Sequence, residues 1–362
     1  MNKAIALYVH VPFCRNICFY CDFCKVFYQE EAANRYLDTL ERELEGKNYW
    51  FKSIYLGGGS PSSLKAYQLE RLLRMLSKYK SESSSFCIEL NPEDMDDEKL
   101  SLLKQYGINR VSIGIQTFDD KLLEKLNRQH NKQMVFKLIE DLRNLEIFDI
   151  NGDLMYALPN QKRTQLLADL KIMVEDLKLP HISTYALSIE KNTYFAVKKV
   201  SALSDDEAAE QYALIGEYLR KANYEHYEVS NFARKGYESK HNLVYWHAEE
   251  YIGLGPGASG YEKGVRYQVS SSVSAYCAGK ITKSHEEIGL DEQAYERIIL
   301  SLRLKEGLDI EKYNQDFQRD FLKDYEKVIA KLLKDQLVVI KRKHLIVKED
   351  KLFILNRILC EF

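Results

Sequence analysis

The chain has 362 residues, of which 45% are hydrophobic and 29% charged, and its formal net charge is −2. This balance is typical of a globular protein with a large core, and it argues against the basic footprint of a nucleic-acid-binding protein. No apolar run reaches the ~20 residues that a membrane-spanning helix needs. The apolar N-terminus lacks a signal-peptide cleavage site, so we expect a cytoplasmic protein whose clustered cysteines bind metal rather than form disulfides.

Alternating β-prone and amphipathic runs fill the first half of the chain. Strands are expected near the N-terminus and at 53–56, 86–90, 109–115, 150–156 and 182–189, and helices at 31–44, 66–78, 96–106, 119–126, 132–145 and 164–177. This alternation predicts parallel βα units, either in an open doubly wound sheet or in a barrel. The first turn has no GxGxxG motif, which weighs against a dinucleotide-binding fold. Polar residues and glycines follow the strands, where barrel enzymes build their sites.

The second half of the chain has a different texture. A helix is expected over 205–222, and the Tyr-, Gly- and His-rich segment 224–268 has few regular signals. From residue 291 the chain is charged and helical, and it ends with apolar segments at 337–347 and 352–359. Two helices plus a β-ribbon would make a small winged-helix-like module. We therefore expect a barrel with the cysteine loop over 1–223, an extension over 224–285 and a C-terminal helical, winged module over 286–362.

Four of the seven cysteines lie in one short segment, CRNICFYCDFC. Its CxxxCxxC spacing, with Tyr20 before the last cysteine of the motif, resembles the signature of the radical S-adenosylmethionine superfamily. The resemblance implies that Cys14, Cys18 and Cys21 hold a [4Fe-4S] cluster and leave one iron open for S-adenosylmethionine (SAM). Cys24 as a fourth ligand would fill that iron, so we expect it to be a non-ligand. The alternative is a four-cysteine zinc site, although no second cysteine pair closes a zinc ribbon.

A wider resemblance covers nearly the whole chain. Eleven segments occur in the order seen in the HemN/HemW family of oxygen-independent coproporphyrinogen dehydrogenases and related heme chaperones: YVHVPFC, CFYCDF, YLGGGSPS, IELNPED, GINRVSIGIQTF, LNRQH, NGDLMYALP, HISTYALSIE, YEVSNFA, HNLVYW and YIGLGPGASG. A single segment such as GGGSP would be weak evidence, but eleven in order are specific. The resemblance implies an α/β fold, namely a partial (β/α)6 TIM-like radical SAM barrel with a C-terminal helical, winged-helix-like domain.

The same resemblance implies which residues contact SAM. They are Tyr8, Tyr20, Gly58, Gly59, Ser60, Glu89, Gln116, Arg128, Asp153, Ala186 and Ala258. Glycines allow close approach of the backbone, a cationic Arg128 suits a carboxylate, and Asp153 suits ribose hydroxyls. The alternative for each residue is structural: Glu89 and Asp153 would cap neighbouring loops, and the glycines would form a plain turn.

Two features distinguish the branches of this family. The coproporphyrinogen dehydrogenases usually carry a fourth cysteine two residues after the third, where this chain has Phe23. They also have a sizeable extension before the cysteine loop, whereas Cys14 lies close to the start of this sequence. Both features resemble the heme-chaperone branch.

An HNxxY motif is also part of that branch, and here it contains His241 and Tyr245. Imidazole is the commonest axial ligand of heme iron and phenolate can also serve, so these two residues are the heme candidates. His226 and His247 are spare candidates. Ordinary packing is the alternative for each, since the chain has 25 tyrosines. Ser259 stands where relatives often have histidine, so the sequence does not identify the residues that would line a porphyrin site.

The expected function is therefore that of a heme-binding protein that passes heme to an acceptor protein, either soluble or membrane-associated, and that uses the cluster and SAM. A flavodoxin or ferredoxin would supply electrons. The alternative from another class is an enzyme that oxidatively decarboxylates two propionates of coproporphyrinogen III. A third alternative is a zinc-stabilised barrel with an unrelated substrate.

Overall fold

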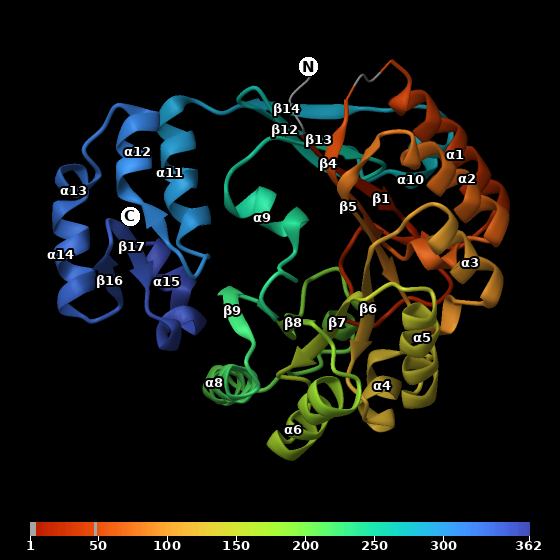
Figure 1. Cartoon of the computed structure of the whole chain (residues 1–362), viewed down its shortest axis with the longest axis horizontal. Helices are drawn as coiled ribbons and strands as arrows, with labels where there is room; N and C mark the ends of the chain where they lie inside the picture. The colour runs from red at the N-terminus through yellow and green to blue at the C-terminus, as the bar shows by residue number, and fades with distance from the viewer. Residues whose placement is uncertain (1–4, 47–48) are drawn as a thin grey trace.

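The computed structural model describes residues 5–46 and 49–362 (Figure 1). Within these residues, one sheet has the strand order β14-β13-β12-β11-β1-β4-β5-β6-β7-β8-β10-β9. Its centre consists of six parallel strands: β1 (Ile5–Val11), β4 (Phe51–Gly58), β5 (Lys80–Leu90), β6 (Arg110–Gln116), β7 (Asp149–Tyr156) and β8 (His181–Ala186). These are the six strands predicted from the alternating pattern, and the predicted partial barrel is confirmed.

Helices connect these strands and cover the outer side of the sheet (Figure 1). They are α1 (Glu30–Leu44), α2 (Ala66–Ser77), α3 (Asp97–Gln105), α4 (Asp120–Leu126), α5 (Lys132–Asn144) and α6 (Arg163–Lys171). Three of them begin at a side-chain cap, in which Asp96, Asp119 or Asn131 accepts a hydrogen bond from a backbone N–H of the first turn. The predicted helix over 164–177 ends in a π-helical turn, Ile172–Asp176.

The segment with few regular signals extends the sheet at both edges, which corrects the expectation of little regular structure. After α7 (Tyr194–Val197) and α8 (Asp205–Lys221), β9 (Glu225–Glu228) and β10 (Asn231–Ala233) add to β8, and α9 (Lys240–Trp246) follows. At the other edge β11 (Tyr251–Leu254) pairs parallel with β1, and β12 (Ser259–Glu262), β13 (Val265–Val269) and β14 (Lys283–Glu287) continue antiparallel, with α10 (Val273–Cys277) between the last two.

The C-terminal part has more helices than predicted. It contains α11 (Leu290–Ser301), α12 (Ile310–Phe317), α13 (Phe321–Asp324) and α14 (Glu326–Lys334), a small sheet of β15 (Leu308–Asp309), β17 (His344–Val347) and β16 (Val338–Lys341), and α15 (Leu355–Leu359). The predicted ribbon at 337–347 is present, as β16 and β17. The other apolar segment, 352–359, is helical instead, because Glu349–Ile354 forms a 3-10 turn that runs into α15.

This C-terminal module meets both edges of the large sheet. It follows β14 directly, through Ile288 and Gly289. Beyond α11 it reaches the opposite edge, where the Val229 N–H donates to the Arg303 carbonyl at 3.1 Å and the Lys305 N–H donates to the Tyr227 carbonyl at 2.9 Å. Helix α9 lies between the module and the barrel (Figure 1). The module therefore bridges the open side of the partial barrel.

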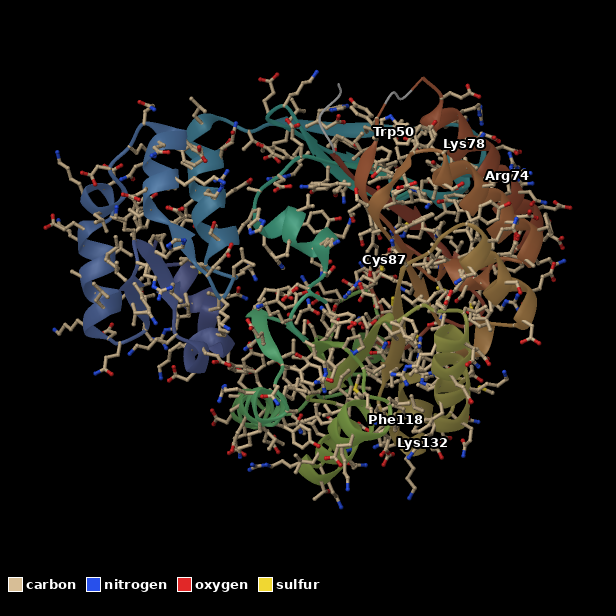
Figure 2. All side chains as sticks on the ribbon, in the orientation of Figure 1. Trp50, Arg74, Lys78, Cys87, Phe118 and Lys132 are labelled. Carbon is tan, nitrogen blue, oxygen red and sulfur yellow. The ribbon has the colours of Figure 1, made fainter. Side chains whose placement is uncertain are left out.

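Side chains fill the space between the sheet and the helices (Figure 2). The core includes Leu7, Ile54, Ile88, Ile113 and Leu154 from successive central strands, all fully buried. Cys87, labelled in Figure 2, lies on β5 in this core, and burial raises the pKa of its thiol. It is a small buried residue and not part of the cysteine loop.

Candidate functional site

The cysteine loop runs from β2 (Phe13–Cys14) to β3 (Val26–Phe27), which pair parallel to each other. The far side of the loop is held by the end of α4. There the left-handed C-cap residue Asn127 (φ 58°) donates from Nδ2 to the Ile17 carbonyl at 2.8 Å, and the Phe19 N–H donates to the Leu126 carbonyl at 3.2 Å. Asparagine tolerates this backbone conformation better than most residues. The loop is thereby fixed against the carboxyl ends of the central strands.

A cavity of about 410 Å³, called the barrel cavity below, opens between the loop and the strand ends. It brings together most of the predicted cofactor residues: Cys14, Cys18, Cys21, Tyr20, Gly58, Gly59, Ser60, Glu89, Gln116, Arg128, Asp153 and Ala186. These residues come from the loop and from β4, β5, β6, β7 and β8 or the segments after them. Their convergence follows from parallel strands, whose carboxyl ends share one edge of the sheet.

The three motif cysteines are close enough to influence one another. Burial and then the neighbouring Cys18 and Cys21 raise the pKa of the Cys14 thiol to about 12. The Arg128 guanidinium donates from Nη1 to the Cys18 sulfur at 3.4 Å. Within the described part of the chain, no three His, Cys, Asp or Glu side chains are already gathered as a metal site. The ligand set Cys14, Cys18 and Cys21 therefore stays a prediction.

The glycine run at the end of β4 is packed too closely for side chains. A Cβ on Gly57 would lie 2.8 Å from the Glu89 carboxylate, and one on Gly59 would lie 2.8 Å from the Phe13 carbonyl. Gly58 has a φ of +118°, and a Cβ there would meet the His10 ring at 2.8 Å. The close packing of the protein around this segment therefore requires glycine at all three positions.

Two carboxylates in the barrel cavity are buried. Glu89 accepts hydrogen bonds from the Tyr55 hydroxyl at 2.8 Å and from the Gly58 N–H at 3.2 Å, and burial raises its pKa to about 7. Asp153 accepts from Asn151 Nδ2 at 2.8 Å, and burial raises its pKa to about 6. A ligand ammonium group beside either carboxylate would offset this cost, and ligand hydroxyls would supply further donors.

Arg128 supplies the fixed positive charge of the barrel cavity. Burial lowers its pKa, but the charges of Cys18 and Tyr20 raise it by more, so the guanidinium stays cationic. Its Nε is buried and has no hydrogen-bond partner among the described residues. A ligand carboxylate would match this donor. The barrel cavity thus contains cysteine thiols, glycine backbone, two buried carboxylates and one guanidinium. This set of groups fits a cluster with SAM on its open iron.

Three residues considered for this region lie elsewhere. Tyr8 and Ala258 are not among the residues that line the barrel cavity. The Tyr8 hydroxyl is hydrogen-bonded to His10 Nδ1 at 3.0 Å, and Ala258 is buried in the core. The Cys24 sulfur donates to the Ser271 carbonyl at 3.3 Å and also does not line the cavity, and its role as a non-ligand stays a prediction.

The heme candidates form a buried network on α9. His241 is 2% exposed, its Nδ1 is hydrogen-bonded to the Ser53 hydroxyl at 2.9 Å, and its Nε2 to the Tyr245 hydroxyl at 2.8 Å. Its ring stacks on Tyr55, with 5.0 Å between ring centroids, and burial lowers its pKa to about 3. Both nitrogens of His241 are therefore engaged, and the ring cannot coordinate iron without leaving these partners.

The remaining histidine candidates and Phe23 have different surroundings. His226 is buried and stacks on Phe232, with 4.0 Å between ring centroids. His247, just after α9, is 40% exposed at its side chain, and its Nε2 is hydrogen-bonded to Glu306 at 3.0 Å. Phe23 is 66% exposed and lines the barrel cavity.

Two residues that contact the site without lining the barrel cavity were not identified from the sequence. Tyr55 connects Glu89 to the His241 ring, and Asn127 anchors the cysteine loop. Asn127 lies in the LNRQH segment, but its role depends on a contact over 110 residues of sequence. Tyr55 begins the YLGGGSPS segment, but its hydrogen bond to Glu89 joins two strands across 34 residues of sequence. Neither role has a local signal.

Comparisons with known proteins agree with this geometry. The Radical SAM superfamily model matches residues 8–172, and the HemN C-terminal domain model matches residues 288–350. A protein named heme chaperone HemW from Lactococcus lactis is 38% identical over 348 residues, which cover 93% of this chain and 92% of that protein. The protein of the same name from Bacillus subtilis is 35% identical over 91% of this chain and 92% of its own.

Among solved structures, coproporphyrinogen III oxidase HemN from Escherichia coli superimposes with a TM-score of 0.87, over 99% of this chain and 90% of its own, at 22% identity. That likeness shows the fold. None of the described helices combines the length and apolar composition needed to cross a bilayer. The identity to two relatives, each over more than nine tenths of both chains, shows the family: the chain belongs to the HemW family of the radical SAM superfamily.

Proposed function

We propose that the protein is a heme chaperone that binds heme and passes it to an acceptor protein, and that it carries a [4Fe-4S] cluster and SAM in the barrel cavity. The observation that carries this proposal is the similarity, over more than nine tenths of the chain, to two proteins named heme chaperone HemW. Phe23, in place of the additional cysteine of the dehydrogenases, and the HNxxY motif support the same branch.

The three regions of the chain would divide the work. The barrel, 1–223, would hold the cluster through Cys14, Cys18 and Cys21, and the extension 224–285 and the module 286–362 would serve heme. The backbone at Gly58–Ser60 would receive the methionine end of SAM, with Arg128 near its carboxylate and Glu89 near its ammonium group. When bound, the cluster supplies single electrons at low potential and a coordination position for SAM. The residues around it bind, orient and shield that pair.

Two partners follow from this proposal. The heme acceptor would be an apoprotein, soluble or membrane-associated, and a flavodoxin or ferredoxin would reduce the cluster. The reading as a coproporphyrinogen dehydrogenase is not favoured, because the likeness to HemN at 22% identity concerns the fold alone.

The test uses full-length protein whose cluster has been reconstituted without oxygen. We expect a brown protein that binds hemin and transfers it to a heme-free acceptor, at a rate that rises with acceptor concentration. Such a rate law indicates direct transfer, whereas prior dissociation gives a rate that does not depend on the acceptor. Failure to bind hemin, together with conversion of coproporphyrinogen III to protoporphyrinogen and release of methionine and 5′-deoxyadenosine, would overturn the proposal in favour of the dehydrogenase.

A further inference from the structure

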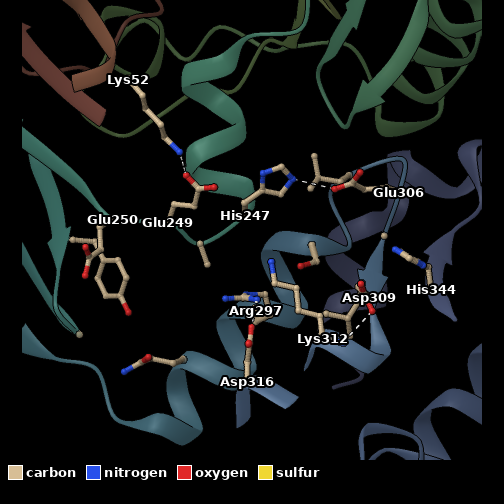
Figure 3. A pocket seen from close by; sticks show the side chains of 18 residues that line it. Lys52, His247, Glu249, Glu250, Arg297, Glu306, Asp309, Lys312, Asp316 and His344 are labelled. Carbon is tan, nitrogen blue, oxygen red and sulfur yellow. Dashed lines mark hydrogen bonds and ion pairs between the residues drawn. The ribbon is translucent and has the colours of Figure 1, made fainter. Parts of the chain in front are cut away.

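A second, larger hollow separates α9 from the C-terminal module (Figure 3). It measures about 830 Å³ and adjoins a cavity of about 400 Å³, and the two share Ala248, Glu249, Tyr261, Gln293 and Arg297. Both volumes lie within the ~300–1,000 Å³ of ordinary ligand pockets. No residue of either cavity lines the barrel cavity. We call the pair the α9 cleft.

Part of the wall of the smaller cavity of the α9 cleft consists of aromatic and aliphatic side chains. They include Tyr245, Tyr251, Ile299, Leu300 and Phe317. The rings of Tyr245 and Tyr251 meet edge to face, with 4.7 Å between centroids. Aromatic faces and branched aliphatic chains are the surfaces on which a flat apolar macrocycle packs.

Two arginines stand at the same cavity. Arg297 pairs with Asp316 at 3.0 Å, and its Nε is buried without a hydrogen-bond partner among the described residues. Arg266 pairs with Glu296 at 2.5 Å and with Glu286 at 3.4 Å. A guanidinium has five N–H donors in a planar fork that matches a carboxylate. A ligand with an apolar plane and carboxylates at one edge fits this combination.

His247 is the imidazole of α9 that faces the cleft. Figure 3 shows it extending from α9 toward Glu306 of the module, and the hydrogen bond to Glu306 uses Nε2. Its Nδ1 has no protein partner among the described residues, and the side chain is 40% exposed. A carboxylate on one ring nitrogen fixes the ring and makes the other nitrogen a better metal ligand. His241, by contrast, has both nitrogens engaged.

Carboxylates also line the larger cavity, and internal partners balance several of them. Glu249 pairs with Lys52, Asp316 pairs with Arg297, and Asp309 accepts a hydrogen bond from the Lys312 N–H at the start of α12 (Figure 3). These partners offset part of the negative charge that an anionic ligand would meet in the larger cavity.

Resting on the proposed function, we infer that heme binds in the α9 cleft, with His247 as axial ligand and Arg297 and Arg266 on the propionates. The macrocycle lies along the aromatic wall of the smaller cavity. His241 then acts as a positioning residue that holds α9 against the barrel, whereas Tyr245 both binds His241 and forms part of the wall of the cleft. Heme and SAM occupy separate cavities on opposite sides of this helix network.

The experiment is a hemin titration of the cluster-loaded full chain, followed by absorbance and resonance Raman spectra. His247→Ala is expected to weaken hemin binding about tenfold or more, a loss of about 1.4 kcal/mol, and added imidazole is expected to restore the axial-ligand bands. Arg297→Gln and Arg266→Gln are expected to weaken hemin binding and to leave those bands unchanged. The matched controls are His285→Ala on β14 and Arg71→Gln on α2, both outside the cleft, and they should bind as the unaltered chain does.

The outcomes separate the two proposals. If the unaltered chain binds no hemin, the proposed function itself fails. If it binds hemin while His247→Ala keeps the same affinity and axial-ligand bands, the α9 cleft is not the site. If His247→Ala loses its cluster or its fold, the test rests on Arg297→Gln and Arg266→Gln. Unchanged hemin affinity in both of these variants overturns the inference.

Discussion

Glu89 and Asp153 are acids whose pKa is raised in the folded protein, and burial is the main cause for both. An acid of this kind holds its proton more tightly when folded than when unfolded. At pH values between the pKa of the unfolded state and that of the folded state, the folded state binds more protons than the unfolded state. The free energy of unfolding therefore falls as pH rises through this range. For Glu89 this window runs from its ordinary value of 4.5 to about 7.

We expect Glu89→Gln to remove part of this pH dependence. In protein without SAM, the unfolding free energy of the unaltered chain relative to the variant should fall between about pH 5 and pH 7, by at most about 1.4 kcal/mol per pH unit. Urea unfolding at several pH values measures the difference. A difference that rises with pH would contradict the raised pKa.

The cysteines give a second test at the scale of single residues. Cys18→Ala should lose the brown absorbance near ~400 nm and the bound iron, because a cluster held by three thiolates needs all three as ligands. Cys24→Ala should keep both, since its sulfur is turned to the Ser271 carbonyl. Iron analysis of the reconstituted variants checks this. Equal losses in the two variants would make Cys24 a ligand.

Helix α9 is the element that separates the barrel cavity from the α9 cleft. Its buried side is fixed by His241, which contacts Ser53 and Tyr55 of β4. Tyr55 in turn donates to Glu89 at the barrel cavity. One strand therefore carries contacts to both the SAM side and the α9 side, and the position of α9 depends on a polar network rather than on apolar packing alone.

His241→Ala should therefore destabilise the chain. It removes a buried ring and leaves the Ser53 and Tyr245 hydroxyls without their partner, and we expect a loss of about 2–4 kcal/mol in the free energy of unfolding. Lys240→Ala, an exposed position on the same helix, should change it by less than about 0.5 kcal/mol. Urea unfolding followed by circular dichroism compares the two. Equal stabilities would show that the network does not hold α9.

At the scale of the whole molecule, the C-terminal module closes an open sheet. The sheet ends at β14 on one side and β9 on the other, and the module contacts both. Leu304 is 4% exposed at the junction with β9 and forms an isolated β-bridge with Glu228. The junction is thus a small buried contact that holds the far end of the module.

Leu304→Asp should open this junction, because it buries an unpaired carboxylate. We expect a loss of about 2–4 kcal/mol in unfolding free energy and faster hydrogen exchange at the amides of Val229 and Lys305. Leu333→Asp on α14, where the leucine is 39% exposed, serves as the matched control. Protection of both amides in Leu304→Asp would mean that the module is held elsewhere.

The sequence predicts the parts of this structure that depend on local periodicity. The six central strands and their helices follow from alternating apolar patterns. The individual residues of the barrel cavity were predicted from the resemblance to the HemN/HemW family. The edge strands β9 to β12 were missed because each has only three or four residues. In addition, β10 and β11 join the sheet through the distant strands β8 and β1. The engagement of both His241 nitrogens depends on Ser53, 188 residues away, and no local pattern reveals it.

The bridge between β14 and β9 has unequal ends. At β14 the chain itself continues through Ile288 and Gly289. Near β9 the links are noncovalent, and they comprise backbone hydrogen bonds, the Leu304 contact and ion pairs such as Lys305–Glu225 and Arg220–Glu349. Rotation about the covalent end is the motion that this attachment would permit once the noncovalent contacts break. Such a swing would widen the space beside His247 and leave the strand ends around the cysteines in place. Cargo could then enter and leave while the oxygen-sensitive metal centre stays shielded from solvent.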